Sequence, residues 1–166
     1  MERILIIGCS GSGKTTLACQ LGDKLGIPVV HLDRLWWTGD WGNVSREEFD
    51  AKLASELEKP QWIIDGNYSR TMEMRLEKCD TILYLDFNRW VCLWGMFKRV
   101  VSNYGRHRPD MGGECRERFD PKFIKWIWNF NKANRERNYR WLNEARHAQT
   151  YAFKNRRQVR AFLASL

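Results

Sequence analysis

The sequence predicts an α/β domain in which a parallel five-stranded sheet carries helices on both faces. Short apolar runs rich in β-branched residues alternate along the chain with segments whose apolar residues recur at helical spacing, and this alternation is typical of parallel sheets. Three of the runs are followed at once by an aspartate, at Asp33, Asp65 and Asp86. The chain has 166 residues, the length of one domain, and we expect a single domain over residues 1–166.

A glycine-rich loop joins the first predicted strand, residues 4–7, to the first predicted helix. Residues 8–15, Gly-Cys-Ser-Gly-Ser-Gly-Lys-Thr, match the phosphate-loop pattern G-x-x-x-x-G-K-[ST] in full. The glycines let backbone N–H groups turn toward an anion, and the helix N-terminus adds a partial positive charge. A glycine-rich turn that fits by chance is the alternative, and the strand before the loop and the helix after it argue against that alternative. We therefore predict a P-loop NTPase whose nucleotide is held by Gly8, Ser10, Gly11, Ser12, Gly13, Lys14, Thr15 and Thr16.

Two side chains of the phosphate loop have predicted chemical roles. Lys14 can reach the β- and γ-phosphates of ATP and is predicted to be catalytic, and the Thr15 hydroxyl can hold a magnesium ion. The apolar run 62–64 is followed directly by Asp65. In phosphate-loop proteins the strand that carries the magnesium-binding carboxylate ends in the same way. We therefore expect ATP and magnesium as cofactors, Thr15 and Asp65 as the metal residues, and Asp65 close to the substrate as well.

Asp33 follows the second predicted strand, residues 29–32. We expect that strand to lie beside the strand of the phosphate loop, which would bring the Asp33 carboxylate near the γ-phosphate. There it can accept a proton from an acceptor hydroxyl or orient the acceptor. The alternative is that Asp33 caps a turn or pairs with Arg34.

A predicted loop over residues 34–42 carries three tryptophans. Trp36, Trp37 and Trp41 can form an aromatic wall for a flat substrate or a hydrophobic cap over the core, and the sequence leaves both open. On the first interpretation Arg34, Trp36 and Trp37 face the acceptor.

The other elements follow from caps, periodicity and proline. Ser45 and Glu48 have the spacing of a capping box, and Asn155 can cap the last helix. The remaining predicted elements are helices from Ser45 to residue 57 and over 69–78 (with Arg70 and Arg75), a strand over 81–85, helices over 89–101 and 121–145, and a strand over 149–153. The aromatic residues among the arginines of 121–145 can stack on nucleic-acid bases or face the core.

Residues about 103–116 are rich in Gly, Pro and Arg and show no periodicity, and we expect a lid segment there. Arg99, Arg106 and Arg108 are predicted to close over the triphosphate and to neutralise charge on the transferring group. The alternative is an ordinary basic surface loop.

Charge divides the chain into two unequal halves. Residues 1–86 have a net charge of −4 and residues 87–166 a net charge of +12, which together give the overall +8. A basic half suggests an anionic partner or a solvated basic surface.

The sequence has no run of 18 apolar residues and no signal peptide, so we expect a cytoplasmic protein without a membrane partner. The five cysteines include no C-x-x-C pair and are expected to be reduced packing residues.

Several motifs that follow one another along the chain together resemble one protein family. They are the phosphate loop, His31-Leu32-Asp33, residues 62–68 (Trp-Ile-Ile-Asp-Gly-Asn-Tyr), Leu85-Asp86-Phe87, Arg108-Pro109-Asp110 and residues 125–130 (Lys-Trp-Ile-Trp-Asn-Phe). Together they resemble the DNA topology modulation, or FlaR-related, family, which is in turn similar to the adenylate kinase group. Asp65-Gly66 followed by Arg70-Thr71 resembles the Asp-Gly-Phe-Pro-Arg-Thr segment of that group with one extra residue, which implies that Arg70 grips a substrate phosphate.

The sequence therefore favours an ATP- and magnesium-dependent kinase for a nucleotide or a small molecule, with an acceptor that the motifs do not identify. One alternative is a nucleic-acid-binding protein with a regulatory nucleotide site, although no DNA-binding motif supports it. Another is a slow ATPase without an acceptor. The oligomeric state is left open.

Overall fold

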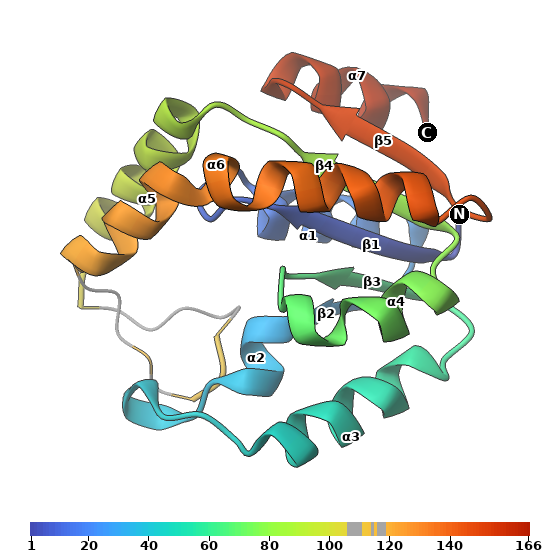
Figure 1. Ribbon diagram of the computed structural model, residues 1–166, viewed down its shortest axis with the longest axis horizontal. Helices are drawn as coiled ribbons and strands as arrows, with labels where there is room; N and C mark the ends of the chain where they lie inside the picture. The colour runs from blue at the N-terminus through green and yellow to red at the C-terminus, as the bar shows by residue number, and fades with distance from the viewer. Residues whose placement is uncertain (106–110, 114, 116–118) are drawn as a thin grey trace.

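The computed structural model describes residues 1–105, 111–113, 115 and 119–166. Its centre is one sheet of five parallel strands in the spatial order β2-β3-β1-β4-β5 (Figure 1). The strands are β1 (Arg3–Gly8), β2 (Val29–His31), β3 (Trp62–Asp65), β4 (Thr81–Leu85) and β5 (Gln149–Phe153). The predicted parallel five-stranded sheet is confirmed.

Helices cover both faces of the sheet. The helical elements are α1 (Lys14–Leu25), α2 (Leu32–Trp36), the 3₁₀ turn η1 (Gly39–Trp41), α3 (Arg46–Leu57), the 3₁₀ turn η2 (Ser69–Thr71), α4 (Met72–Lys78), α5 (Arg89–Asn103), α6 (Pro121–Glu144) and α7 (Arg156–Ser165). Alternate residues of a strand point to opposite faces, so Ile4 and Ile6 join one core with α1, α5 and α7, while Leu5 and Ile7 join the other with α3 and α4. The long helix α6 contributes Phe130 to the first core and its later turns to the second.

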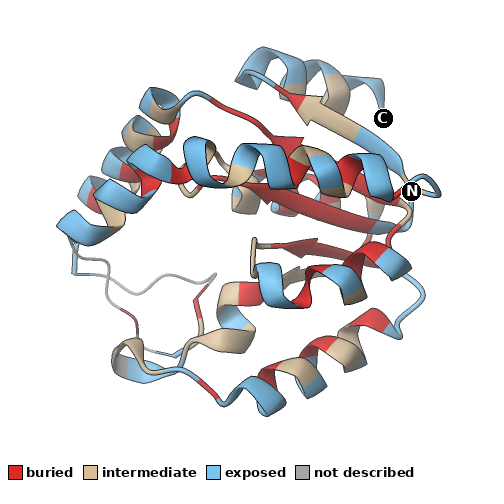
Figure 2. Ribbon diagram, in the orientation of Figure 1, coloured by how far each residue is buried: buried red, intermediate tan, exposed pale blue. Residues whose placement is uncertain are grey.

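Burial follows the order of the strands. The strands β1, β3 and β4 are buried almost throughout, whereas the edge strands β2 and β5 are partly exposed (Figure 2).

Helix starts agree with the predicted caps, because Ser45 accepts from the Glu48 amide and Asn155 from the Gln158 amide. Cys9, Cys79, Cys92 and Cys115 are buried free thiols and Cys19 is exposed. No helix in the described part of the chain is long and apolar enough to cross a membrane.

Two expectations about the second strand are wrong. The strand β2 is not adjacent to β1, because β3 pairs with both and lies between them. It also ends at His31, and Asp33 is the second residue of α2, so the segment expected to be a loop begins as a helix. The order of the strands in the sheet differs from their order in the chain. The segment between β2 and β3 contains α2 and α3, and the strand that follows it, β3, pairs with β1.

Candidate functional site

The phosphate loop lies between the buried end of β1 and the first turn of α1. Gly13 precedes α1 with φ 98°, and a Cβ built on it would meet nothing within 4 Å, so the backbone there is open on the side where a side chain would stand. The N–H groups of the first residues of a helix have no intrahelical acceptor, and at α1 these residues are Lys14, Thr15 and Thr16. The loop therefore has the backbone geometry that binds phosphate.

Two cations border this loop. The Lys14 ammonium donates to the Cys9 carbonyl at 3.0 Å, and the Arg99 guanidinium donates through Nη1 to the Ser10 hydroxyl at 3.2 Å. Arg99 comes from α5, which approaches the loop so closely that a Cβ on Gly95 would lie 2.0 Å from the Gly11 carbonyl oxygen. Only glycine permits that contact, so the small residue on α5 brings the Arg99 side chain to the loop. The structure thus brings both Lys14 and Arg99 to the phosphate loop.

Three polar side chains meet at the start of α1 and the ends of two strands. The Thr15 hydroxyl donates to Asp65 Oδ2 at 3.0 Å, and His31 Nδ1 lies 2.5 Å from Asp65 Oδ1. His31 and Asp65 are register partners at the carboxyl ends of β2 and β3. No role for His31 was predicted from the sequence. Its place near the end of the second predicted strand, two residues before Asp33, is the signal that could have identified it.

The pair Thr15 and Asp65 fits a magnesium ion carried by a nucleotide. Magnesium binds through one or two protein oxygens while substrate phosphates and water supply the rest, and a hydroxyl beside a carboxylate is such a donor set. Within residues 1–105, 111–113, 115 and 119–166, no cluster of three or more His, Cys, Asp or Glu could hold a metal alone. The residues present therefore suit a metal that arrives with phosphate groups.

Asp33 lies in the first turn of α2 and contacts the loop of residues 66–68. The Tyr68 hydroxyl donates to Asp33 Oδ1 at 2.7 Å. Burial and the Asp33 charge raise the pKa of Tyr68 well above its ordinary value, so this phenol stays protonated and donating. The structure thus gives Asp33 a hydrogen-bond partner in Tyr68, and Arg34 beside it is exposed.

The loop that carries Tyr68 is held by a buried arginine. Arg75 of α4 is fully buried, and its guanidinium donates to the carbonyls of Gly66, Asn67, Tyr68 and Thr71. Burial lowers the pKa of Arg75 to about 9, which still leaves it cationic at neutral pH. On the other side of the loop, the Asn67 side chain accepts from the Gly8 amide at 3.1 Å and donates to the Gly8 carbonyl at 2.9 Å. Residues 66–68 therefore connect the phosphate loop to Asp33.

One cavity of about 480 Å³ joins these parts. Its lining combines Ser10 and Lys14 of the phosphate loop with Asp33 of α2 and Tyr68 of the loop 66–68. The remaining lining residues are Trp37, Trp41, Gly66, Asn67, Arg99, Met111, Asp120, Phe123 and Trp126. A volume of this size falls within the range of small-molecule sites.

The tryptophans and arginines predicted to face the acceptor divide into two groups. Trp37 lines the cavity and packs edge-on against Trp41, whereas Trp36 packs on Phe49 and Tyr68 at the core. Trp37 and Trp41 therefore lie at the cavity, and Trp36 packs at the core.

The two arginines of the acceptor prediction do not belong to the described lining of the cavity. Arg34 is exposed, and Arg70 is exposed and forms two hydrogen bonds, of 2.6 and 2.7 Å, with the Asp50 carboxylate on α3. The structure therefore does not bring Arg70 to the position that the resemblance implied. The segment that contains the extra residue, residues 67–69, runs into the turn η2 before α4.

The predicted lid is described only in part. Arg106 and Arg108 lie outside the described residues. Met111 is buried and lines the cavity, and the amide of Gly112 donates to the Asp33 carbonyl at 3.4 Å. A Cβ on Gly112 would lie 1.9 Å from the Trp37 carbonyl oxygen, so this segment touches the backbone after α2.

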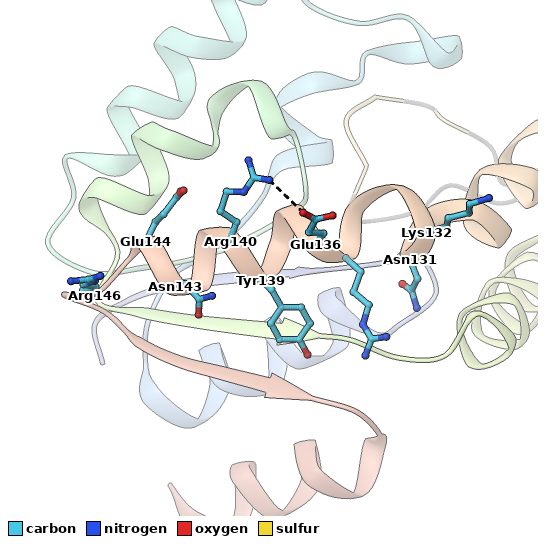
Figure 3. A pocket seen from close by; sticks show the side chains of 9 residues that line it. Asn131, Lys132, Glu136, Tyr139, Arg140, Asn143, Glu144 and Arg146 are labelled. Carbon is cyan, nitrogen blue, oxygen red and sulfur yellow. Dashed lines mark ion pairs between the residues drawn. The ribbon is translucent and has the colours of Figure 1, made fainter.

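A second hollow, of about 1040 Å³, runs along α6, whose side chains supply most of its lining (Figure 3). Nearby, the buried Asp86 carboxylate accepts from Arg135 Nε at 3.0 Å, from Tyr139 at 2.8 Å and from Lys154. Burial alone would raise the pKa of Asp86, but the hydrogen bonds and charge of these partners lower it. This hollow is larger than the cavity at the phosphate loop, but its lining includes none of the loop's residues. We therefore place the functional site at the smaller cavity.

Comparison with known proteins supports the fold. No family model and no curated protein matches the chain. Among solved structures, the chain is similar to shikimate kinase from Bacteroides thetaiotaomicron, with a TM-score of 0.56 and 19% sequence identity, covering 99% of this chain and 95% of that one. The protein has the P-loop NTPase fold of the adenylate-kinase-like type, with a five-stranded parallel sheet.

Proposed function

We propose that the protein is a kinase that transfers the γ-phosphoryl group of ATP to a hydroxyl-bearing small molecule or nucleotide. The observation that carries the proposal is that one cavity is lined both by Lys14 of the phosphate loop and by Asp33. A phosphoryl transferase needs both a phosphate-binding end and an end that holds the acceptor. A nucleotide-binding protein without an acceptor does not require the second end.

In this mechanism the phosphate end binds the phosphates of ATP and neutralises their negative charge. The amides of the loop and of the first turn of α1 bind the phosphates, and Lys14 contacts the β- and γ-phosphates. Arg99, already at the loop through Ser10, adds a second positive charge. Magnesium supplies further neutralisation of phosphate charge when bound, and Thr15 and Asp65 are the residues that would hold it.

At the acceptor end, Asp33 orients the acceptor hydroxyl and accepts its proton while the acceptor oxygen bonds to the γ-phosphorus. The bond from that phosphorus to the β–γ bridging oxygen breaks, and ADP leaves. The hydrogen bond from Tyr68 holds the Asp33 carboxylate in position. Trp37 and Trp41 provide an apolar wall for the acceptor. The lid arginines Arg106 and Arg108 remain part of the proposal on the basis of their sequence position.

The acceptor can be found by a screen of ADP release. The wild-type protein is incubated with ATP, magnesium and individual nucleosides, nucleotides or small phosphorylated metabolites, and the products are checked for a new phosphate ester. We expect one class of acceptor to raise ADP release well above the rate without acceptor. A rate that no acceptor changes would favour the slow ATPase.

The net charge of +12 in residues 87–166 supports a second candidate, a nucleic-acid-binding protein whose nucleotide site is regulatory. This candidate agrees with the resemblance to the DNA topology modulation family. Its test is DNA affinity as a function of salt, which should fall on the order of 10³-fold or more between 50 and 200 mM if 6–10 phosphates are contacted. An absence of DNA binding at low salt, together with acceptor-dependent ADP release, would leave the kinase.

A further inference from the structure

Helix α5 has apolar side chains on two faces. Its inner face places Cys92, Met96 and Val100 in the core. Its outer face carries Trp90, Trp94, Phe97 and Val101, which are exposed to 62%, 57%, 48% and 63%. The helix lies at the edge of the molecule, and exposed turns follow one another along it (Figures 1 and 2). A surface helix of a monomer normally has one apolar stripe, which faces the core, so the outer stripe has no function in the folding of one chain.

The spacing of the outer stripe is that of a helix-packing seam. Residues 90, 94, 97 and 101 are separated by four, three and four positions, which is the alternating a/d pattern by which one helix packs against another. The exposed Tyr104 continues the series three positions later, directly after the end of α5. A groove for a flat ligand or a scattered set of surface residues does not require this regular spacing.

The exposed area is large enough to form much of an interface. Trp128 of α6 extends the patch, because its ring packs edge-on against Trp90 at 5.0 Å. If a whole aromatic side chain has about 200 Å² of surface, the five exposed rings present on the order of 500 Å². This lies at the upper end of the roughly 300–600 Å² of the largest patch on typical monomers. It is also more than half of the ≈ 800 Å² that each partner of a standard interface buries.

The charges around the stripe favour a second copy of the chain over an anionic surface. Residues 89–103, all of them described, contain no acidic residue and one exposed cation, Lys98. The Arg89 guanidinium lies over the Trp128 ring, 4.8 Å from its centroid, and Arg99 is directed to Ser10 at the phosphate loop. Binding of anionic lipid requires clusters of 4–8 basic residues, whereas an almost uncharged aromatic stripe can pair with itself without strong repulsion.

We propose that the outer face of α5 is a self-association surface, on which the α5 helix of a second copy packs in a two-fold symmetric dimer. In such an isologous interface each copy presents the same patch. The stripe of Trp90, Trp94, Phe97 and Val101 then becomes the buried seam, with Trp128 at its margin. This inference does not depend on the proposed kinase activity.

The test is the mass of the protein in solution by sedimentation velocity and light scattering over a wide concentration range. The chain has a mass of 19.8 kDa, and we expect the wild type to have twice that mass. Trp94→Glu with Phe97→Glu places charge in the seam and should raise the dimer dissociation constant on the order of 100-fold or more. Leu166→Glu is the matched control, because Leu166 is a comparably exposed apolar residue outside the stripe, and this variant should remain a dimer.

Folding of each variant is checked by circular dichroism and thermal melting, and Val101→Lys provides a milder second variant. A wild type that is monomeric at every concentration would overturn the proposal, as would a folded double variant that stays dimeric. The same proteins are tested by co-sedimentation with vesicles of anionic phospholipid and with a single-stranded oligonucleotide. A monomeric wild type that binds either through the stripe would also overturn the proposal in favour of that partner.

Discussion

The two ends of the cavity are built in different ways. The phosphate end is formed by one continuous segment, residues 8–16, whose glycines and helix start shape the backbone directly. The acceptor end is assembled from α2 and the loop 66–68, which are far apart in sequence and are joined by the hydrogen bond from Tyr68 to Asp33. That loop depends in turn on the buried Arg75. The first end is thus a local motif, and the second depends on tertiary contacts.

Replacement of Lys14 tests the phosphate end and should have the largest effect. Lys14→Ala removes a charge that contacts the transferring phosphate, and we expect the transfer rate to fall about 10³-fold, as when a single group that stabilises transition-state charge is lost. Lys14 lines the cavity and is not part of either core, so the melting temperature should change little. The measurements are ADP release and thermal melting, with the exposed Lys52→Ala on α3 as the control. Wild-type turnover by Lys14→Ala would remove the basis of the whole proposal.

Replacement of Asp33 separates the two ends of the cavity. Asp33→Asn keeps the shape of the side chain and removes its charge, so ATP should bind almost normally while single-turnover transfer falls about 10²-fold, the usual scale for a positioned general base. The two measurements are ATP affinity by titration and transfer in a single turnover with the acceptor from the screen. If stability and ATP affinity fall while transfer by the bound complex stays intact, Asp33 is structural.

The features that could be predicted from the sequence follow the same division. The strands, most helices and the phosphate loop could be predicted because periodicity, caps and glycine spacing are local signals, as at Ser45, Asn155 and residues 8–15. The contact of Asp65 with Thr15 also followed from a known pattern. The positions of Tyr68 and Arg75 could not be predicted, because the fold alone brings residues 66–68 beside α2. The expected place of the second strand beside that of the phosphate loop was wrong for the same reason, since strand neighbours are set by tertiary packing.

Removal of the Tyr68 hydroxyl tests whether the acceptor end depends on that tertiary contact. Tyr68→Phe keeps the ring on Trp36 and Phe49 but loses the hydrogen bond to Asp33. A hydrogen bond to a charged group contributes about 1.5 kcal/mol or more, so we expect kcat to fall about tenfold while KM for ATP is unchanged. An increase in KM for ATP with normal kcat would contradict a role at the acceptor end.

The pKa of Tyr68 gives this test a pH dependence. Burial and the Asp33 charge raise that pKa above the ordinary value near 10, so the hydroxyl remains a donor throughout the neutral and mildly alkaline range. The ratio of wild-type to Tyr68→Phe activity should therefore stay constant as the pH rises from 6 to 9. A ratio that falls toward one at alkaline pH would show that Tyr68 ionises with a lower pKa and stops donating.

The smallest effect is expected at Arg70, where the resemblance and the structure differ. The resemblance to the adenylate kinase group implies that Arg70 grips a substrate phosphate, whereas the structure pairs its exposed guanidinium with Asp50. Because exposed ion pairs contribute little to stability, Arg70→Ala should melt close to the wild type. Its kcat and its KM for the acceptor should stay within about twofold of the wild type, since no phosphate contact is lost.

The matched control for Arg70 is Asp50→Ala, which breaks the same ion pair and leaves the arginine in place. If the pair is only a surface contact, both variants should behave alike. If Arg70 binds an acceptor phosphate when the acceptor is present, Arg70→Ala alone should raise the acceptor KM severalfold, because the lost interaction is a charge-assisted hydrogen bond. Asp50→Ala should then lower that KM or leave it unchanged, since it frees the guanidinium. That pattern would show that the acceptor end extends beyond the cavity toward α3, and that the acceptor carries a phosphate.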